Sequence, residues 1–454
     1  DRGAARIATE LEGQPRLQAD MMNLMGDVYR ELALYEEARP LLTRALEQRR
    51  REPGEKDLEL AESLRATAIL LEEQGSPREA LEHLEETRRI QEAAFGPEDP
   101  AVARTLTDIG RVQELLGEFA EARKSLEQAL DIEEARLPAL APQTGLTLKG
   151  LGEVLKETGD HAAAKERLLR ALEILQASFE PDHPHVTATR LLLGDTLRFT
   201  SDDEGAREQY ETALPLIERS YGEDHPQVAV ALTKLGNLLN SIGEREEAIG
   251  CHRRALRIRR QALGEQHPDV AASLNNLGYA LYFRRDFEEA KTVLEESARI
   301  YEATLGKDHA DLALPLRNLA AVERSLGNLS VSADLYERVL RLREKAYGPE
   351  SAFLVSSLYN LGRLKLETGR AEEAESFLRR AIALGRDYEP YRHPEIIQPN
   401  IDLALSLGIQ GKLDQAEDLI SRVLDDPDLE NRARSRAAET LEELRRLRRT
   451  GTGS

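Results

Sequence analysis

Small and apolar residues recur along this chain at a fixed interval of 42 residues. Ten positions separated by that interval carry a small residue, which we call the mark of each repeat: Gly26, Ala68, Gly110, Gly152, Gly194, Gly236, Gly278, Ala320, Gly362 and Ala404. The residue before the mark is apolar in nine of the ten repeats, and a second small residue, such as Ala38 or Ala290, follows twelve positions after every mark. Apolar positions around both small residues follow the helical period of about 3.6 residues. Each repeat is therefore predicted to be a pair of closely packed helices.

Start and stop signals divide each repeat into its two helices. Seven repeats have a glycine seven residues after the mark, where a left-handed cap would end the first helix: Gly75, Gly117, Gly159, Gly243, Gly327, Gly369 and Gly411. A proline tolerated at the first helical position recurs at multiples of 42 residues, at Pro184, Pro226, Pro268 and Pro394. We number the repeats 1 to 10 in chain order.

The predicted fold class is all-α, a right-handed solenoid of about ten 42-residue helical hairpins. Residues 1–12 are expected to form a leading helix, residues 13–427 the repeat array, and residues 428–449 a polar closing helix, beginning at Asn431, that covers the last hairpin. Such end helices are needed because an open end of the stack would expose its core. Residues 450–454 are expected to be a flexible tail.

The charge balance narrows the range of partners. The chain has 62 Lys and Arg against 83 Asp and Glu, a net charge of −21. A general role in binding nucleic acid or an anionic membrane is therefore not expected. Cys251 is the one cysteine, so no internal disulfide can form, and no apolar run approaches the roughly 18 residues of a membrane span.

Five histidines, His183, His225, His267, His309 and His393, recur at one repeat position. Successive copies in a stack of hairpins would lie about 20 Å apart, whereas zinc ligands lie about 2.1 Å from one ion. We therefore interpret them as helix-start residues and expect no metal site. His252 and Cys251 are interpreted as packing residues.

Other candidate chemistry is equally weak, and neither a catalytic site nor a cofactor is expected. Gly150 and Gly152 lie inside a predicted helix, so they do not form a dinucleotide-binding loop. Glu72 and Glu73 are adjacent on a helix and point in different directions. An arginine cluster is expected on the solvated outer face of the second helix of repeat 6: Arg253, Arg254, Arg257, Arg259 and Arg260.

The L-G pair at the mark, followed by E-E-A twelve residues on, resembles the tetratricopeptide repeat. Units of 42 residues that open with H-P, as in residues 222–236 (GEDHPQVAVALTKLG) and 264–278 (GEQHPDVAASLNNLG), are similar to kinesin light chain repeats. The resemblance implies a protein-binding scaffold whose first helices line a concave groove. It also implies a peptide-contacting role for Asn275 and Asn276, which lie in an L-N-N-L segment.

Inward positions of the first helices then fall six, three and two residues before the mark and one, four and five after it. We call the residues that share one repeat position a column. In repeats 6 to 9 these columns are cationic, amide-rich and aromatic, with Glu367 the one acid. We predict that they bind an acidic or extended segment of a partner protein, through Lys234, Asn237, Asn275, Asn276, Tyr279, Arg317, Asn318, Tyr359, Asn360 and Arg363. The row Asn276, Asn318 and Asn360 is expected to hold a peptide backbone. The alternative is an ordinary solvated groove.

The same columns in repeats 1 to 4 are mixed and more acidic: Asn23, Asp27, Arg30, Glu31, Glu62, Arg65, Glu72, Glu73, Arg104, Asp108, Arg111, Glu114, Lys149, Glu153 and Glu157. The two halves of the array are therefore expected to prefer different ligands.

Two biological roles stay open. Residues 1–42 resemble the start of the repeat region in bacterial serine/threonine protein kinases, which implies a docking or sensing arm, extracytoplasmic if a transmembrane helix precedes it. No kinase motif lies within the sequence itself. The other role is a free-standing cytoplasmic adaptor similar to kinesin light chains.

Overall fold

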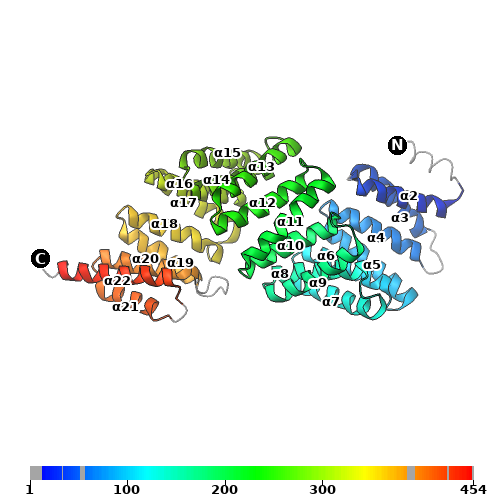
Figure 1. The fold of residues 1–454 in the computed structure, drawn as a ribbon, viewed down its shortest axis with the longest axis horizontal. Coiled ribbons are helices and arrows are strands. Elements are labelled where there is room, and N and C mark those ends of the chain that lie inside the picture. Colours follow the sequence, from blue (N-terminus) through cyan, green and yellow to red (C-terminus); the bar gives the residue numbers. More distant parts are fainter. Residues whose placement is uncertain (1–12, 33, 52–56, 386–393, 427–428, 452–454) are drawn as a thin grey trace. The chain divides into compact units, whose positions relative to one another are not determined.

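The computed structural model describes residues 13–32, 34–51, 57–385, 394–426 and 429–451, and in this part of the chain every regular element is a helix (Figure 1). The chain divides into two compact bodies, Asp1–Glu223 and Asp224–Ser454. The predicted leading helix over residues 1–12 and the last three residues of the predicted tail lie outside the described residues. Among the described helices, none is both long and apolar enough to cross a membrane.

The first body consists of five successive helical hairpins. Their helices are α2 (Pro15–Glu31) with α3 (Tyr35–Arg51), α4 (Leu58–Glu73) with α5 (Pro77–Phe95), α6 (Pro100–Leu115) with α7 (Phe119–Arg136), α8 (Pro142–Glu157) with α9 (His161–Ser178), and α10 (Pro184–Phe199) with α11 (Asp203–Tyr221). The second helices α3, α5, α7 and α9 also pack on the first helix of the next hairpin. This arrangement confirms the predicted stack of repeats.

The second body continues the pattern with five more hairpins. They pair α12 (Pro226–Ile242) with α13 (Arg245–Leu263), α14 (Pro268–Arg284) with α15 (Phe287–Leu305), α16 (Ala313–Ser325) with α17 (Leu329–Tyr347), α18 (Val355–Glu367) with α19 (Ala371–Gly385), and α20 (Pro394–Ile409) with α21 (Leu413–Leu424). A closing helix, α22 (Asn431–Gly451), packs on α20 and α21. It runs two residues beyond the predicted end at Arg449.

At marks that carry glycine, the two helices of a hairpin approach each other very closely. A Cβ atom placed on Gly278 would lie 2.5 Å from Leu294 Cγ, and one on Gly26 would lie 2.5 Å from a methyl carbon of Leu42. Both leucines stand sixteen residues after their marks, and both are fully buried. The mark therefore accepts only a very small residue wherever a large side chain fills this position.

The first helices begin and end as the sequence signals predict. Pro226 and Pro268 stand at the start of α12 and α14, whereas alanine occupies the equivalent positions 310 and 352. There the chain forms the short 3-10 turns η1 (Ala310–Leu312) and η2 (Ala352–Leu354) ahead of the α-helix. At the other end, Gly243 has a φ of 91° and caps α12. Arg285 adopts the same left-handed conformation, with a φ of 74°, in repeat 7, which lacks this glycine.

Candidate binding grooves

The ten predicted site residues of repeats 6 to 9 all lie on first helices of hairpins in the second body. α12 carries Lys234 and Asn237, α14 carries Asn275, Asn276 and Tyr279, α16 carries Arg317 and Asn318, and α18 carries Tyr359, Asn360 and Arg363. The first helices α12, α14 and α16 contact one another in that order. We keep the name of the predicted groove for the surface formed by these ten residues and call it the second-body groove.

Asparagine side chains link α14 to α16 in this groove. Asn318 Nδ2 donates to Asn275 Oδ1 at 2.9 Å, and Asn318 is only 8% exposed. Arg317 donates to Asn318 Oδ1 at 3.3 Å, and Asn275 Nδ2 lies 3.5 Å from Asn276 Oδ1. The amide of Asn318 is thus already occupied by groups of the chain itself, and it links Arg317 and Asn275 to each other.

Two aromatic side chains of α14 are exposed at the second-body groove. Tyr279 is 40% exposed and Phe283 is 39% exposed, and their ring centroids lie 4.8 Å apart in an edge-to-face arrangement. Phe283 was not among the predicted site residues. It stands five residues after the mark Gly278, one of the inward columns, so its repeat position could have revealed it.

The other end of the second-body groove is tied to the closing helix. Arg436 of α22 lies 2.5 Å from Asp402 of α20, and both groups interact with the hydroxyl of Tyr359. Burial raises the pKa of Tyr359. Arg363 lies 3.4 Å from Glu367. Tyr359 therefore contributes to the packing of the closing helix, and it is also one of the residues predicted to bind a ligand.

Among the residues that the structure describes, Arg317 has no acidic partner. Its guanidinium donates to the amide oxygen of Asn318. Asn237 and Asn360 likewise form no side-chain hydrogen bond to another described residue of the groove. The half-buried cation and amides are thus available to a ligand.

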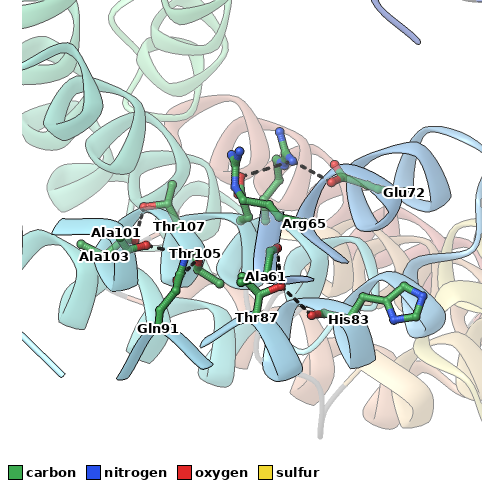
Figure 2. A network of polar contacts seen from close by, with 12 residues as sticks. Ala61, Arg65, Glu72, His83, Thr87, Gln91, Ala101, Ala103, Thr105 and Thr107 are labelled. Atoms are coloured by element: carbon green, nitrogen blue, oxygen red, sulfur yellow. Dashed lines mark hydrogen bonds and ion pairs between the residues drawn. The ribbon is translucent and has the colours of Figure 1, made fainter. Parts of the chain in front are cut away.

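A groove of about 970 Å³ runs along the first helices α2, α4, α6 and α8 of the first body. All the inward residues predicted for repeats 1 to 4, except Glu72 and Glu157, line it. We call it the first-body groove. Arg65 of α4 donates to Asp108 of α6 at 2.7 Å, part of the network of polar contacts in Figure 2. The mixed, more acidic residues predicted for repeats 1 to 4 therefore lie together on one continuous surface.

A polar pair that the sequence interpretation missed joins the second helix of one repeat to the first helix of the next. Its members stand 14 residues apart: Gln91 and Thr105 (2.7 Å, Figure 2), Glu133 and Thr147 (3.0 Å), Arg49 and Ser63 (2.9 Å), Arg259 and Ser273 (2.6 Å), and Arg343 and Ser357 (2.9 Å). The signal was present, since a Ser or Thr recurs five residues before the mark in these repeats. Such pairs satisfy polar groups at the interface between hairpins.

Glu133 is the acidic member of these polar pairs. Its side chain is fully buried, and Thr147 Oγ1 donates to Glu133 Oε1 while Oε2 has no hydrogen-bond partner. Burial raises the pKa of Glu133 to about 7. The carboxyl group therefore takes up a proton near neutral pH.

The repeated histidines begin helices, as predicted. The Nδ1 atoms of His183, His225, His267 and His309 each accept a hydrogen bond, at 3.1 to 3.3 Å, from the backbone N–H two residues later. His393 lies outside the described residues. His252 is buried against Gly236, and burial lowers its pKa to about 4.

The arginine cluster of repeat 6 needs one correction. Arg253 and Arg260 form ion pairs with Glu289 and Glu296 of the next second helix, at 2.6 and 2.7 Å, on the outer face as expected. Arg259 does not lie on that face. It turns between the hairpins and donates to Thr233 and Ser273, because it occupies the polar column described above.

Solved structures similar to this one include those of a putative kinesin light chain, BtubC and RapI. A putative kinesin light chain of Podosopora anserina with nearly identical repeats is 22% identical, covers 46% of this chain and 98% of its own, and gives a TM-score of 0.42. BtubC (BKLC) of P. vanneervenii is 26% identical and covers 52% of this chain and 92% of its own, with a TM-score of 0.44. The apo form of RapI is 16% identical, covers 63% and 98%, and gives 0.49.

No curated protein matches the sequence. The sequence pattern of the tetratricopeptide repeat matches residues 17–93, 78–135, 143–219, 201–261, 239–303, 269–345 and 311–387. These matches span well over half of the chain and lie over the first nine hairpins, from α2 to α19. The chain therefore belongs to the tetratricopeptide repeat family.

Proposed function

We propose that this protein is a non-catalytic scaffold that binds an acidic, extended segment of a partner protein in its second-body groove. Tetratricopeptide repeats mediate protein–protein interactions, and the groove offers the chemistry for an acidic ligand. The observation that carries the proposal is Arg317, a half-buried cation without an acidic partner in the described residues, which is held by the amide of Asn318, itself bonded to Asn275 of α14. A carboxylate of the ligand would complete its hydrogen bonds.

The amides and the aromatic rings supply the remaining contacts. Asn237 and Asn360 each carry donors and an acceptor, which suits the backbone of an extended segment. Tyr279 and Phe283 form an exposed aromatic pair that suits an apolar side chain of the ligand. A segment in which acidic residues flank one apolar residue would therefore fit the second-body groove.

The experiment compares two variants that each remove one positive charge. The probe is a fluorescein-labelled peptide of alternating glutamate pairs and single leucines, measured by fluorescence polarisation. Arg317→Ala is expected to weaken binding about tenfold, equivalent to about 1.4 kcal/mol. Arg253→Ala, on the outer face, is expected to leave it unchanged. If both variants lost the same affinity for the peptide, the effect would come from net charge alone, and the proposal would be overturned.

The resemblance of residues 1–42 supports a more specific role, the docking or sensing arm of a bacterial serine/threonine protein kinase. None of the similar structures reported above adds support for a kinase, and a free-standing adaptor is the alternative. The coding sequence upstream of Asp1 distinguishes the two. If the upstream sequence encodes a kinase domain followed by a hydrophobic helix, this chain is the docking arm and lies on the opposite side of the membrane from the kinase domain. If it encodes a start codon, the chain is the cytoplasmic adaptor.

A further inference from the structure

Helix α2 has an exposed apolar face. Its other side packs on α3, and Ala19 and Met22 are buried there. The exposed face carries four large apolar residues at intervals of four, three and four, a spacing that places them on one side of a helix. They are between 37% and 60% exposed: Leu17, Met21, Leu24 and Val28. No described helix precedes α2 in the chain, and these side chains are left on the surface.

The equivalent face of the next first helices is buried. Met21 stands five residues before the mark, and the residues in the same column, Ser63 and Thr105, are fully buried. Val28 stands two residues after the mark, and its equivalent Leu70 is only 1% exposed. The preceding second helix covers this face, since α3 packs on α4 and α5 packs on α6. The exposed face of α2 is therefore the one on which a preceding second helix packs in the following repeats.

Contacts within the array define how such a second helix is aligned. Near the connecting loop, residues 14 apart meet, as Arg49 of α3 donates to Ser63 of α4 at 2.9 Å. Farther from the loop, residues 28 apart meet, as Leu42 and Leu70 belong to one core cluster. Seven residues earlier in α3 thus correspond to seven residues later in α4, because the two helices are antiparallel.

Residues 1–12 have apolar side chains at the positions that this alignment requires. Applied to α2, the alignment gives three apolar pairs: Ile7 with Met21, Ala4 with Leu24, and Leu11 with Leu17. Spacings of three and four residues place Ala4, Ile7 and Leu11 on one side of a helix. The opposite side of that helix would carry polar residues, namely Arg2, Arg6 and Thr9. The segment therefore has the amphipathic pattern of a helix that covers this face.

Gly13 has the backbone conformation that ends a second helix elsewhere in the array. Its φ is 93°. Gly96 and Gly222, with φ of 90° and 92°, directly follow the second helices α5 and α11 and cap them. Gly13 stands one residue after the repeat position of Gly96. Glycine favours this left-handed region, which suits the end of a helix before the turn into α2.

We propose that residues 1–12 form a second helix that docks on the exposed face of α2 and covers Leu17, Met21 and Leu24. Continuity with the interface between α3 and α4 supports this occupant, because the same columns meet in the same antiparallel order. The docked helix removes apolar surface of α2 from water and leaves its own polar side to the solvent.

Disulfide cross-linking in the full chain tests the alignment. Cys251→Ser removes the natural cysteine, and Ile7→Cys with Met21→Cys then places two thiols across the proposed contact. The control is Thr9→Cys with Met21→Cys, because Thr9 lies about 200° around the helix from Ile7. Mild oxidation is expected to link positions 7 and 21 within one molecule about tenfold faster than positions 9 and 21. Mass spectrometry of proteolytic peptides identifies each linked pair.

Two outcomes of the cross-linking would overturn the proposal. Equal rates for the two pairs would show that the segment does not dock in this alignment. A link between two molecules, visible as a dimer on a non-reducing gel, would show that a second copy of the chain covers the face.

Hydrogen exchange gives an independent test without cysteines. Ile7→Asp places a charge in the proposed contact and is expected to speed exchange in α2 about tenfold, because the docked helix no longer stabilises it. Thr9→Asp, on the opposite side of the segment, is the matched control and is expected to leave the exchange of α2 unchanged. Equal exchange in the two variants would contradict the docking.

Discussion

Asn318 of α16 donates its amide to Asn275 of α14 at 2.9 Å, although the two residues are 43 positions apart in the sequence. Arg65 of α4 makes the equivalent contact with Asp108 of α6 at 2.7 Å, again between the position three before one mark and the position two before the next. The same two columns of the repeat thus join neighbouring first helices in both bodies. Residues at these columns therefore link neighbouring first helices to each other.

The amide pair should therefore be energetically coupled. Asn318→Ala leaves a partly buried acceptor on Asn275 without its donor and is expected to destabilise the protein by about 1–2 kcal/mol. Adding Asn275→Ala should cost little more, which gives a coupling energy of about 1 kcal/mol in a double-mutant cycle measured by urea unfolding. Strictly additive losses would show that the hydrogen bond contributes nothing to stability.

The buried carboxyl of Glu133 should make stability depend on pH. Its pKa is about 7 in the folded chain against 4.5 as the ordinary value, so the folded state holds the proton more tightly. Stability is then greatest below about pH 4.5 and falls as the pH rises to about 7. Glu133→Gln keeps the acceptor for Thr147 and is expected to stabilise the protein by about 1 kcal/mol at about pH 8, a value reduced for solvent screening.

Thermal melts at two pH values test this prediction. The gain in Tm for Glu133→Gln should be present at about pH 8 and absent at about pH 4. Glu127→Gln, which removes an exposed carboxylate from the same helix, serves as the control and should change Tm little at either pH. A gain of the same size at both pH values would mean that the carboxyl is not protonated near neutral pH.

The close contact at the mark of repeat 7 predicts a compensating pair of substitutions. Gly278→Ala places a Cβ atom 2.5 Å from Leu294 Cγ and is expected to destabilise the protein by about 1–3 kcal/mol through overpacking. Leu294→Ala alone should cost about 2–5 kcal/mol because it leaves a cavity. Together they should cost less than the sum, as measured by urea unfolding. A full additive loss would contradict the close approach of α14 and α15.

Arg285 occupies a backbone conformation that glycine fills in seven other repeats. Its φ of 74° is strained for a residue with a side chain, so Arg285→Gly is expected to raise stability by about 0.5–1 kcal/mol. Arg285→Ala removes the same long side chain but keeps a Cβ atom, and it should bring no gain. If alanine stabilised as much as glycine, the effect would come from the lost charge.

The repeat pattern was sufficient to predict the hairpins, because small residues at the mark and twelve positions later report directly on helix contacts. The surface Arg253 was also placed correctly, since its ion pair needs only a neighbouring repeat. Arg259 and Glu133 were not identified as interface residues. The repeat position that they share carries Arg, Gln, Glu or apolar residues in different repeats. It shows no common chemistry unless the Ser or Thr 14 residues later is considered with it.

The groove residues show a similar limit. The inward columns predicted which helices carry Arg317 and Tyr279, yet the sequence could not show that Asn318 is buried and bonded to Asn275. That outcome depends on the distance between α14 and α16, which a single repeat does not encode. In the same way, Arg65 and Arg104 are equivalent charges in the sequence, whereas the structure gives Arg65 a 2.7 Å ion pair with Asp108 and gives Arg104 no ion pair with a described residue.

Hydrogen exchange read by mass spectrometry, with and without the acidic peptide, tests the central claim most directly. Binding in the second-body groove predicts slower exchange in the first helices α14, α16 and α18, with little change in the second helices α13, α15 and α17. Protection confined to the second helices, or spread evenly over both, would contradict the account and place the binding surface elsewhere.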